Sequence, residues 1–245
     1  MDFRKFLSSF APLTAVAMAA LVAGCDHANV TIDGEKGKLL SELDLSGAPP
    51  HGVVLFGPDK VEIAHGDKLA ITVDGDPVEA AHLRYTLKDG TLGILREKGT
   101  WTNSKPVTVK VSMPAPSEVT MTGSGSIHAS ELAPKAQVVI AGSGDVVTGA
   151  LATEKLDVNI AGSGNFRAEG KAAALDLTIA GSGSANLAGL RTDTADISIV
   201  GSGDARFASD GKVKANVAGS GSVYVKGRAQ CEISAVGSGK LVCEP

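Results

Sequence analysis

Seven copies of the tripeptide Gly-Ser-Gly recur in the second half of the chain, and their spacing restricts the fold more than any other feature. Successive copies are 18 to 20 residues apart, and they begin at Gly123, Gly142, Gly162, Gly181, Gly201, Gly219 and Gly237. A period near 20 residues sustained over seven copies is typical of a solenoid, in which each repeat packs against its neighbours. Seven copies are too many for one site, so we interpret the tripeptide as structural.

Apolar and polar residues alternate on both sides of each tripeptide. In the fourth copy, apolar residues lie six, four and two positions before the first glycine and four and six positions after it: Leu175, Leu177, Ile179, Ala185 and Leu187. A period of two with one apolar side indicates a β-strand. Glycine suits the bend between two strands because it adopts positive φ without strain. The sequence therefore predicts an all-β fold, with a parallel β-helix of about seven coils over residues 116–245.

The preceding residues, 39–115, also read as strands and are assigned to the same domain. The segments "KVEIA", "LAITV", "LRYTL", "TLGIL" and "VTVKVSM" alternate or are rich in β-branched residues. Asp89-Gly90 between the third and fourth segments is a hairpin-turn signal. No comparable stretch has helical periodicity, so we expect strands throughout.

Residues 1–24 are predicted to be an export signal. Arg4 and Lys5 form a charged start, and an apolar stretch follows over residues 6–23. A transmembrane helix is the alternative, but two serines and a proline leave the stretch short of about 20 uninterrupted apolar residues. A cleaved signal is therefore the favoured interpretation.

The segment "LVAGC", which ends at Cys25, resembles the lipobox of bacterial lipoproteins. The resemblance implies cleavage before Cys25, acylation of this residue with chains such as palmitate, and a tether over residues 25–38. A stray cysteine after an ordinary signal is the alternative. Two or more acyl chains anchor a protein stably in a membrane. We therefore expect a lipoprotein of the bacterial cell envelope that faces the periplasm or the cell surface; Asp26 resembles an inner-membrane retention signal, but the choice of membrane stays open.

Charge and composition restrict the partners. The net charge is −4, and it becomes −5 when residues 1–24 are removed. Nucleic acid binding requires a basic surface, so no nucleic acid partner is expected. Aromatic residues make up only 4% of the chain, which indicates a thin core.

The serines of the repeat are not expected to be catalytic. A serine nucleophile needs a base within hydrogen-bond reach, and His128 is the only histidine that falls in the regular coils. A phosphate-binding loop needs a helix N-terminus after its glycines, whereas a strand follows here. We predict no catalytic residue and no cofactor.

Three aspartates form a weak candidate for a cation site. Asp157, Asp176 and Asp196 occupy the same outward position in three successive coils. Like charges stacked at strand spacing repel each other, so the carboxylates either point apart into water or hold a cation, for which oxygen ligands are suited. The first alternative is favoured, and no confident metal site is predicted.

Cys231 and Cys243 lie six residues before and six residues after the first glycine of the last copy. Both positions point inward, and a disulfide can persist in an exported chain. We therefore favour a disulfide that closes the C-terminal end of the solenoid; two small buried thiols are the alternative.

Two aromatic residues are candidates for surface contact. Sugar binding usually uses aromatic faces beside polar groups, and only Trp101 and Tyr224 are expected to point outward. Packing of Trp101 over an end of the solenoid is an equally good interpretation.

The chain resembles the head GIN domain family, described as putative auto-transporter adhesins, over about residues 39–242. The resemblance rests on "LSELDLSG" (residues 40–47), "YTLKDGTLGI" (residues 85–94) and "VTVKVSMPAPSEVTMTGSGSI" followed by the repeats. It implies a right-handed β-helix-like fold in the bacterial envelope and no established biochemical activity. The segment "APPHG" (residues 48–52) departs from the family pattern, because it interrupts the strand expected after "LSG".

Three classes of function follow. The leading prediction is a lipid-anchored, non-enzymatic module for adhesion or surface interaction, with an envelope glycan or protein as partner. The second is a β-helix that binds or processes an envelope polysaccharide, which would need carboxylates or cations clustered on one face. The third is a structural spacer. The sequence leaves the oligomeric state open.

Overall fold

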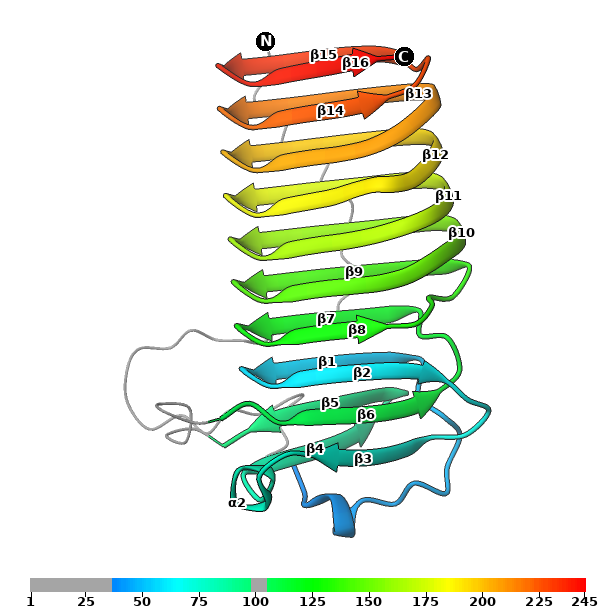
Figure 1. Ribbon diagram of the computed structural model, residues 1–245, viewed down its shortest axis with the longest axis vertical. Coiled ribbons are helices and arrows are strands. Elements are labelled where there is room, and N and C mark those ends of the chain that lie inside the picture. The colour runs from blue at the N-terminus through cyan, green and yellow to red at the C-terminus, as the bar shows by residue number, and fades with distance from the viewer. Residues whose placement is uncertain (1–36, 98–104) are drawn as a thin grey trace.

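The alternating sequence forms strands that wind into a tall column of flattened coils (Figure 1). This computed structural model describes residues 37–97 and 105–245. The predicted export signal, Cys25, Asp26 and Trp101 lie outside the described residues. The first strands are β1 (Gly52–Gly57), β2 (Lys60–His65), β3 (Ala70–Asp74), β4 (Leu83–Lys88), β5 (Thr91–Arg96) and β6 (Thr108–Met113).

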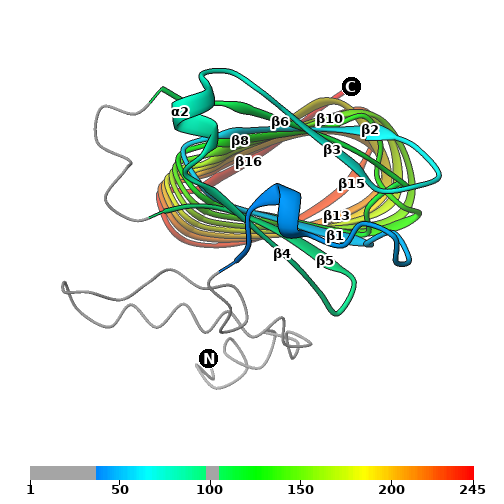
Figure 2. The same ribbon diagram turned by 90° about the horizontal axis from the view of Figure 1, so that it is seen from below.

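The repeat region forms the parallel solenoid that its period predicts. Its strands are β7 (Glu118–Gly123), β8 (Ser126–Ala129), β9 (Lys135–Gly142), β10 (Asp145–Gly162), β11 (Asn165–Gly181), β12 (Ser184–Gly201), β13 (Asp204–Gly219), β14 (Ser222–Lys226), β15 (Gln230–Gly237) and β16 (Lys240–Glu244). Neighbouring coils pair in register, so that Leu156 lies beside Leu175 and Gly162 beside Gly181. In the middle coils one strand continues around the wide turn, from one bend to the next (Figure 2).

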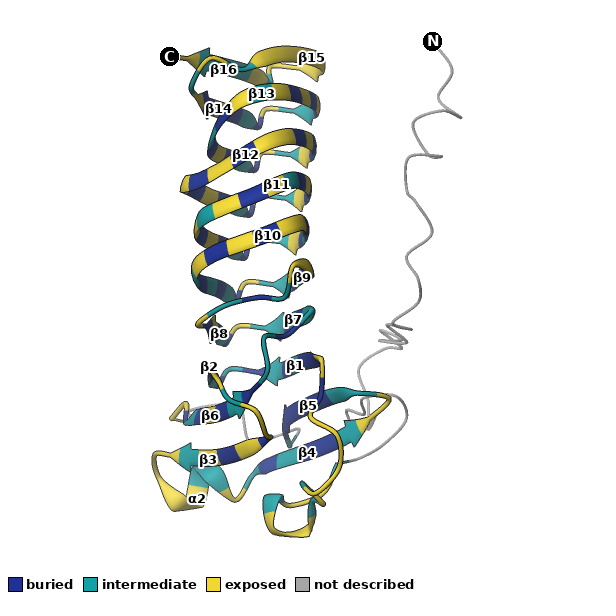
Figure 3. Cartoon of the chain, turned by 90° about the vertical axis from the view of Figure 1, so that its right-hand side faces the viewer, coloured by how far each residue is buried: buried dark blue, intermediate teal, exposed yellow. Residues whose placement is uncertain are grey.

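The predicted inward positions form the core of the column. Leu177, Ile197 and Phe207 are at most 1% exposed, and buried stripes alternate with exposed ones along the strands of the middle coils, β10 to β13 (Figure 3). Burial of one such side chain stabilises the fold by about 1.5–3 kcal/mol. Each coil therefore gains most of its stability from the coils above and below it.

Both glycines of each bend are required by the stacking. The first glycine has a φ between 111° and 128° in all seven copies, a region that favours glycine. A Cβ atom added to Gly162 would lie 2.5 Å from the carbonyl oxygen of Gly142 in the coil below, and one added to Gly164 would meet Ile140. The intervening Ser163 donates its backbone N–H to the Gly142 carbonyl at 2.9 Å. The bend is thus built from backbone contacts that leave no room for a side chain at either glycine.

The stacking extends below the repeat region, to strands that the period does not reveal. β1 and β2 form a coil beneath β7 and β8, with Gly57 in register with Gly123. Gly57, Pro58 and Asp59 replace Gly-Ser-Gly at this bend. β5 and β6 pair in parallel beneath β1 and β2 and form one further coil. The strand β1 begins at Gly52, the last residue of "APPHG".

Antiparallel strands cover the lower end of the column. We call this lower end, which comprises β1 to β6 with α2 (Pro77–Ala80) and the 3-10 turn η1 (Leu40–Glu42), the head. β3 pairs with β6, and β4 pairs with β5 through the predicted turn, where Asp89 and Gly90 have φ values of 49° and 74°. The helix α2, which was not expected, is initiated by the side chain of Asp76, which accepts the Val78 N–H at 2.8 Å. This helix and η1 are too short to cross a membrane, as far as the described residues go.

A buried ion pair joins the two lowest coils of the head. Arg96 and Asp59 are 0% and 1% exposed. The Arg96 Nε donates to Asp59 Oδ2 at 2.7 Å, and Asp59 Oδ1 also accepts the Val107 N–H at 3.0 Å. Glu79 of α2 accepts from Arg96 Nη1 at 2.7 Å. The hydrogen bond and charge of Asp59 raise the pKa of Arg96, so the guanidinium stays charged inside the head.

Candidate interaction surface

The outward residues of the coils form two long faces, one on each side of the bends. The pre-bend face carries outward residues of the strand segments before each bend, for example 157–161, 176–180 and 196–200. The post-bend face carries those of the segments after each bend, for example 165–167, 204–206 and 222–226. Because neighbouring coils pair in register, equivalent outward residues stack in columns along the axis. These columns are the surface that the fold presents to a partner.

The bend serines lie in a row at the edge between the two faces. All seven are exposed. In the six bends from Ser143 onward, the backbone N–H of the serine donates to a glycine carbonyl of the coil below. Within residues 37–97 and 105–245, no bend serine is hydrogen-bonded to a histidine. His128 lies on the post-bend face, where desolvation and the nearby Lys60 lower its pKa. The arrangement gives the serines no base to activate them.

The three aspartates stack on the pre-bend face as expected. Asp157 pairs with Asp176, and Asp176 pairs with Asp196 in the next coil. Lys155 Nζ lies 2.8 Å from Asp157 Oδ1, and Lys214 stands beside Asp196 at the upper end of the row. Desolvation and the charge of Asp157 raise the pKa of Asp176.

This row lacks the geometry of a cation site. In the part of the chain that the structure describes, no three or more His, Cys, Asp or Glu side chains are grouped closely enough to hold a metal ion. The carboxylates are one strand apart along the axis, and a lysine already neutralises the lowest of them. The arrangement favours solvated carboxylates over a bound cation.

A hydrogen-bonded column of polar side chains runs along the post-bend face. Asn165 Nδ2 donates to Asp145 Oδ1 at 2.8 Å, and Ser184 Oγ donates to Asn165 Oδ1 at 2.6 Å. Two coils higher, the Ser222 N–H donates to Asp204 Oδ1 at 3.0 Å. These bonds fix the side chains next to the bends, so this part of the face is ordered and leaves fewer free polar groups for a ligand.

The neighbouring column of the post-bend face carries a cation and an aromatic ring in contact. The guanidinium carbon of Arg206 lies 5.1 Å from the centre of the Tyr224 ring, within the range of a cation–π interaction. Tyr224 is 39% exposed, in agreement with the outward position expected for it. Arg206, Tyr224 and Lys226 also line a shallow depression beside the wide turn. We call these three residues the Arg-Tyr patch.

The sequence could have located the Arg-Tyr patch more fully. Arg206 and Tyr224 each lie five residues after the first glycine of their copies, so the alignment places them in one column. Of the patch residues, only Tyr224 was predicted to make surface contacts, because the criterion was an exposed aromatic ring. The pairing with a cation follows from the register of β13 and β14.

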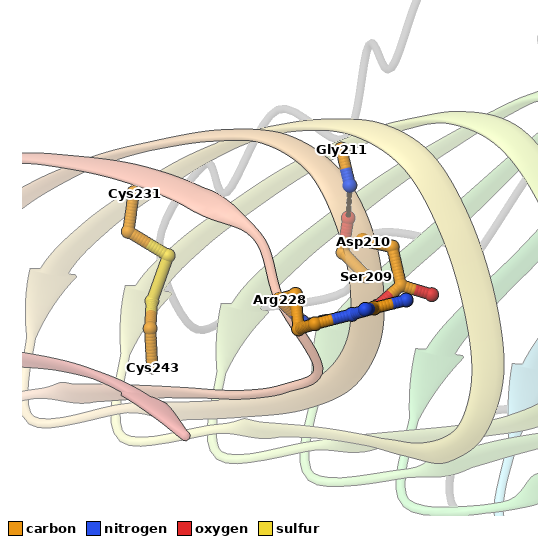
Figure 4. Close-up of a disulfide and its surroundings, with 6 residues drawn as sticks. All are labelled: Ser209, Asp210, Gly211, Arg228, Cys231 and Cys243. Atoms are coloured by element: carbon orange, nitrogen blue, oxygen red, sulfur yellow. Dashed lines mark hydrogen bonds between the residues drawn. A yellow bond between two sulfur atoms is a disulfide. The ribbon is translucent and has the colours of Figure 1, made fainter. Parts of the chain in front are cut away.

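The structure joins Cys231 and Cys243 by a disulfide that crosses the last coil from β15 to β16 (Figure 4). Their Cα atoms are 6.8 Å apart. The bridge lies over Val213 and Val225, which pair with the two cysteines in the coil below and are at most 2% exposed. Both cysteines point inward as expected, but Cys231 is exposed because, among the described residues, no coil covers it from above.

Comparison with known proteins gives a family match and several related folds. A family model described as "Putative auto-transporter adhesin, head GIN domain" matches residues 49–229. No curated protein is detectably similar to the chain.

Solved structures from Bacteroides and Parabacteroides share the fold. A putative adhesin from Bacteroides fragilis NCTC 9343 is 22% identical with a TM-score of 0.72, covering 80% of this chain and 93% of its own. A putative adhesin from Parabacteroides distasonis ATCC 8503 is 22% identical with a TM-score of 0.66, covering 82% and 94%. A putative lipid binding protein from the same strain is 21% identical with a TM-score of 0.63, covering 81% and 94%. At these identities the likeness establishes the fold alone.

Proposed function

Because the chain belongs to the head GIN domain family of putative auto-transporter adhesins, we propose that it is a non-enzymatic adhesion module of the bacterial cell envelope. In this proposal a lipid on Cys25 anchors the chain in a membrane, and the solenoid presents its outer faces to an envelope glycan or protein. The Arg-Tyr patch is the observation that carries the proposal. It combines an exposed ring with two cations on a rigid surface.

The chemistry of the patch suits a glycan that carries carboxylate or other anionic groups. The Tyr224 ring offers an apolar face against which a sugar can stack, and its hydroxyl offers a polar edge. Arg206 supplies positive charge beside it, whereas Lys226 lies next to Glu244, which also lines the depression. A guanidinium binds carboxylates with two parallel hydrogen bonds. Because the strands beneath are held by paired neighbours on both sides, binding would order few additional groups.

Two observations favour surface binding over other uses of the fold. The inward positions of the described coils carry buried apolar side chains that form one continuous packed core, which leaves the outer faces as the surface for a partner. The acidic row on the pre-bend face (Asp157, Asp176 and Asp196) is the clearest carboxylate cluster for polysaccharide cleavage. This row is a straight stack along the axis, and Lys155 pairs with Asp157 at its lower end. It lacks a second carboxylate facing the first across a gap, which glycoside hydrolysis requires.

Binding of purified protein to isolated cell envelopes tests the proposal. We expect Tyr224→Ala and Arg206→Ala each to weaken binding by about five- to tenfold, the usual effect of removing an aromatic or arginine contact. Arg167→Ala is the matched control, because Arg167 is exposed in the same column two coils away. Equal binding by all three variants, or turnover of envelope glycan by the purified protein, would refute this function.

The anchor needs a separate measurement. Cys25→Ser is expected to move the protein from the membrane fraction to the soluble fraction of the cells. Binding to isolated envelopes by the released protein would persist, since the Arg-Tyr patch is unchanged. Retention of Cys25→Ser in membranes would contradict the lipid anchor without affecting the binding proposal.

A further inference from the structure

The last coil, which we call the tail, leaves apolar side chains uncovered. Ile233 of β15 is 44% exposed, whereas Ala215 and Ile197, which stack below it in the same column, are 2% and 1% exposed. Leu241 of β16 is only partly buried. The exposed surface of β15 is visible at the top of the column in Figure 3. The tail thus exposes side chains of a type that every coil beneath it buries.

The tail also has an unpaired backbone edge. β15 pairs only with β13, and β16 pairs only with β14, so within the described residues the upper edge of each strand has no neighbour. Such an edge presents free N–H and C=O groups on which another strand can add. At the head, β4 and β3 pair with the lower edges of β5 and β6, and Lys38 forms a β-bridge with Tyr85 on the outer side of β4.

The outward charges of β16 are complementary when two copies of this strand lie antiparallel to each other. Lys240, Val242 and Glu244 point outward from this strand at the two ends and in the middle. If two copies of β16 pair antiparallel about Val242, each Lys240 lies opposite the partner's Glu244. Opposite charges directly across an antiparallel pair stabilise it.

We infer that the tail is a homodimerisation surface, in which β16 of one copy pairs antiparallel with the partner's β16 about a twofold axis at Val242. The same rotation brings β15 beside the partner's β15, so that the uncovered Ile233 and Leu241 of both copies are buried together. The interface uses the same patch on both copies, and it therefore closes at two subunits. Stacking of tail on head would form filaments instead, but that contact would not place Lys240 opposite a Glu244.

Tail-to-tail pairing deepens the proposed function, although the pairing itself does not rest on it. Gly37, the first described residue, enters the fold at the head, where Lys38 pairs with Tyr85. A dimer joined at the tails therefore places its two points of attachment at opposite ends. With the proposed lipid anchors, this geometry would join two membrane surfaces through two copies of the same chain.

Cysteine crosslinking tests the register directly. In the proposed dimer Val242 lies opposite the partner's Val242, at a Cα distance of about 4.5–5.5 Å that a disulfide can span. We expect Val242→Cys to form a covalent dimer on non-reducing gels. Val147→Cys is the matched control, because Val147 occupies the same outward position in a lower coil and is equally half-buried. Crosslinking of Val242→Cys no stronger than that of Val147→Cys would overturn the inference.

Charge reversal tests the same interface in solution. For the full chain in detergent, Lys240→Glu should raise the dimer dissociation constant by on the order of tenfold, since both cross-strand pairs become repulsive. Lys240→Glu combined with Glu244→Lys should restore it, which also excludes misfolding as the cause. Lys171→Glu, an equal charge change on an exposed residue of β11, should have no effect.

Three results would overturn the dimer. The first is a full chain that remains monomeric at about 0.1 mM. The second is a double variant that dimerises as weakly as Lys240→Glu. The third is a tail that pairs with a strand of another protein while the chain itself stays monomeric. Envelope binding measured on the same monomeric protein shows whether the proposed function survives that outcome.

Discussion

The two ends of the solenoid are closed by different means. The head is covered by two antiparallel strands and a short helix, and a buried Arg96 with two carboxylate partners fixes them to the lowest coils. The tail has one disulfide across its last coil, and the outward edges of β15 and β16 stay open. A solenoid needs a cap at each end. Here one cap is a folded structure built from many contacts, and the other is a single covalent bond.

This difference indicates which parts of the column tolerate mutation. In the head, packing and ion pairing depend on each other, so that loss of one partner leaves a charge buried without compensation. At the tail, the disulfide restrains a coil that has neighbours on one side only. We therefore expect the head to respond to mutation as a unit and the tail to respond locally.

The largest effect is expected at Asp59. Asp59→Ala leaves the guanidinium of Arg96 buried without its main partner, which should lower the free energy of unfolding by about 3–5 kcal/mol. Urea unfolding followed by circular dichroism measures the change. Glu79→Gln is the control, because its side chain is partly exposed and keeps an oxygen for Arg96 Nη1. Equal free energies of unfolding for the two variants would show that the buried Arg96–Asp59 pair does not stabilise the head.

Loss of the disulfide should have a smaller and more local effect. The bridge closes a loop with a sequence separation of 12 residues, for which loop-closure entropy corresponds to about 3 kcal/mol as an upper value. Cys231→Ser with Cys243→Ser should therefore loosen β15 and β16. Amide hydrogen exchange should become faster in these strands and stay unchanged in β1 and β5 of the head.

Labelling of free thiols tests the disulfide itself. The unfolded, unreduced protein should offer neither Cys231 nor Cys243 to the reagent. Two reactive sulfurs would contradict the bridge, and the tail would then be closed by apolar packing alone.

The same bend substitution should cost less at the tail than in the middle. Gly181→Ala places a Cβ against the carbonyl oxygen of Gly162 at a φ of 126°, and the coils on both sides resist any shift. We expect a loss of about 2 kcal/mol, in the range of a strained backbone position. Gly237→Ala meets Gly219 at a φ of 111°, but its coil can move upward, which relieves the contact and leaves only the cost of the positive φ, so about 1 kcal/mol should be lost. Thermal unfolding of the two variants, side by side, measures the difference; equal losses would show that the tail is as rigid as the middle.

The contrast between the ends also explains what the sequence could predict. The repeat region was predicted down to its inward columns, because each coil meets an identical environment and one periodic rule decides which residues are buried. In the head, the bend Gly57-Pro58-Asp59 breaks the motif, and the order in space differs from the order in the chain, since β1 lies between β5 and β7. Asp59 and Arg96 are 37 residues apart, and no local pattern relates them. The Arg-Tyr patch lies between these cases: its column follows from the period, but the contact depends on which side chains that column happens to carry.

The smallest effect is expected in the acidic row of the middle coils, which ends toward the tail at Lys214. Desolvation and the charge of Asp157 raise the pKa of Asp176 above its ordinary value near 3.8, so the folded protein binds this proton more tightly than the unfolded chain does. The unfavourable charge is fully present above the folded pKa and is relieved as the pH falls through it. Because Asp176 is exposed and solvent screens its charge, Asp176→Asn should stabilise the protein at pH 7 by only about 0.5 kcal/mol, and the gain should vanish below about pH 4. Asp196→Asn is the control, because Asp196 loses attraction to Lys214 as well as repulsion from Asp176. Its stability at pH 7 should stay near that of the natural chain, and an equal gain in both variants would mean that Lys214 does not balance the upper end of the row.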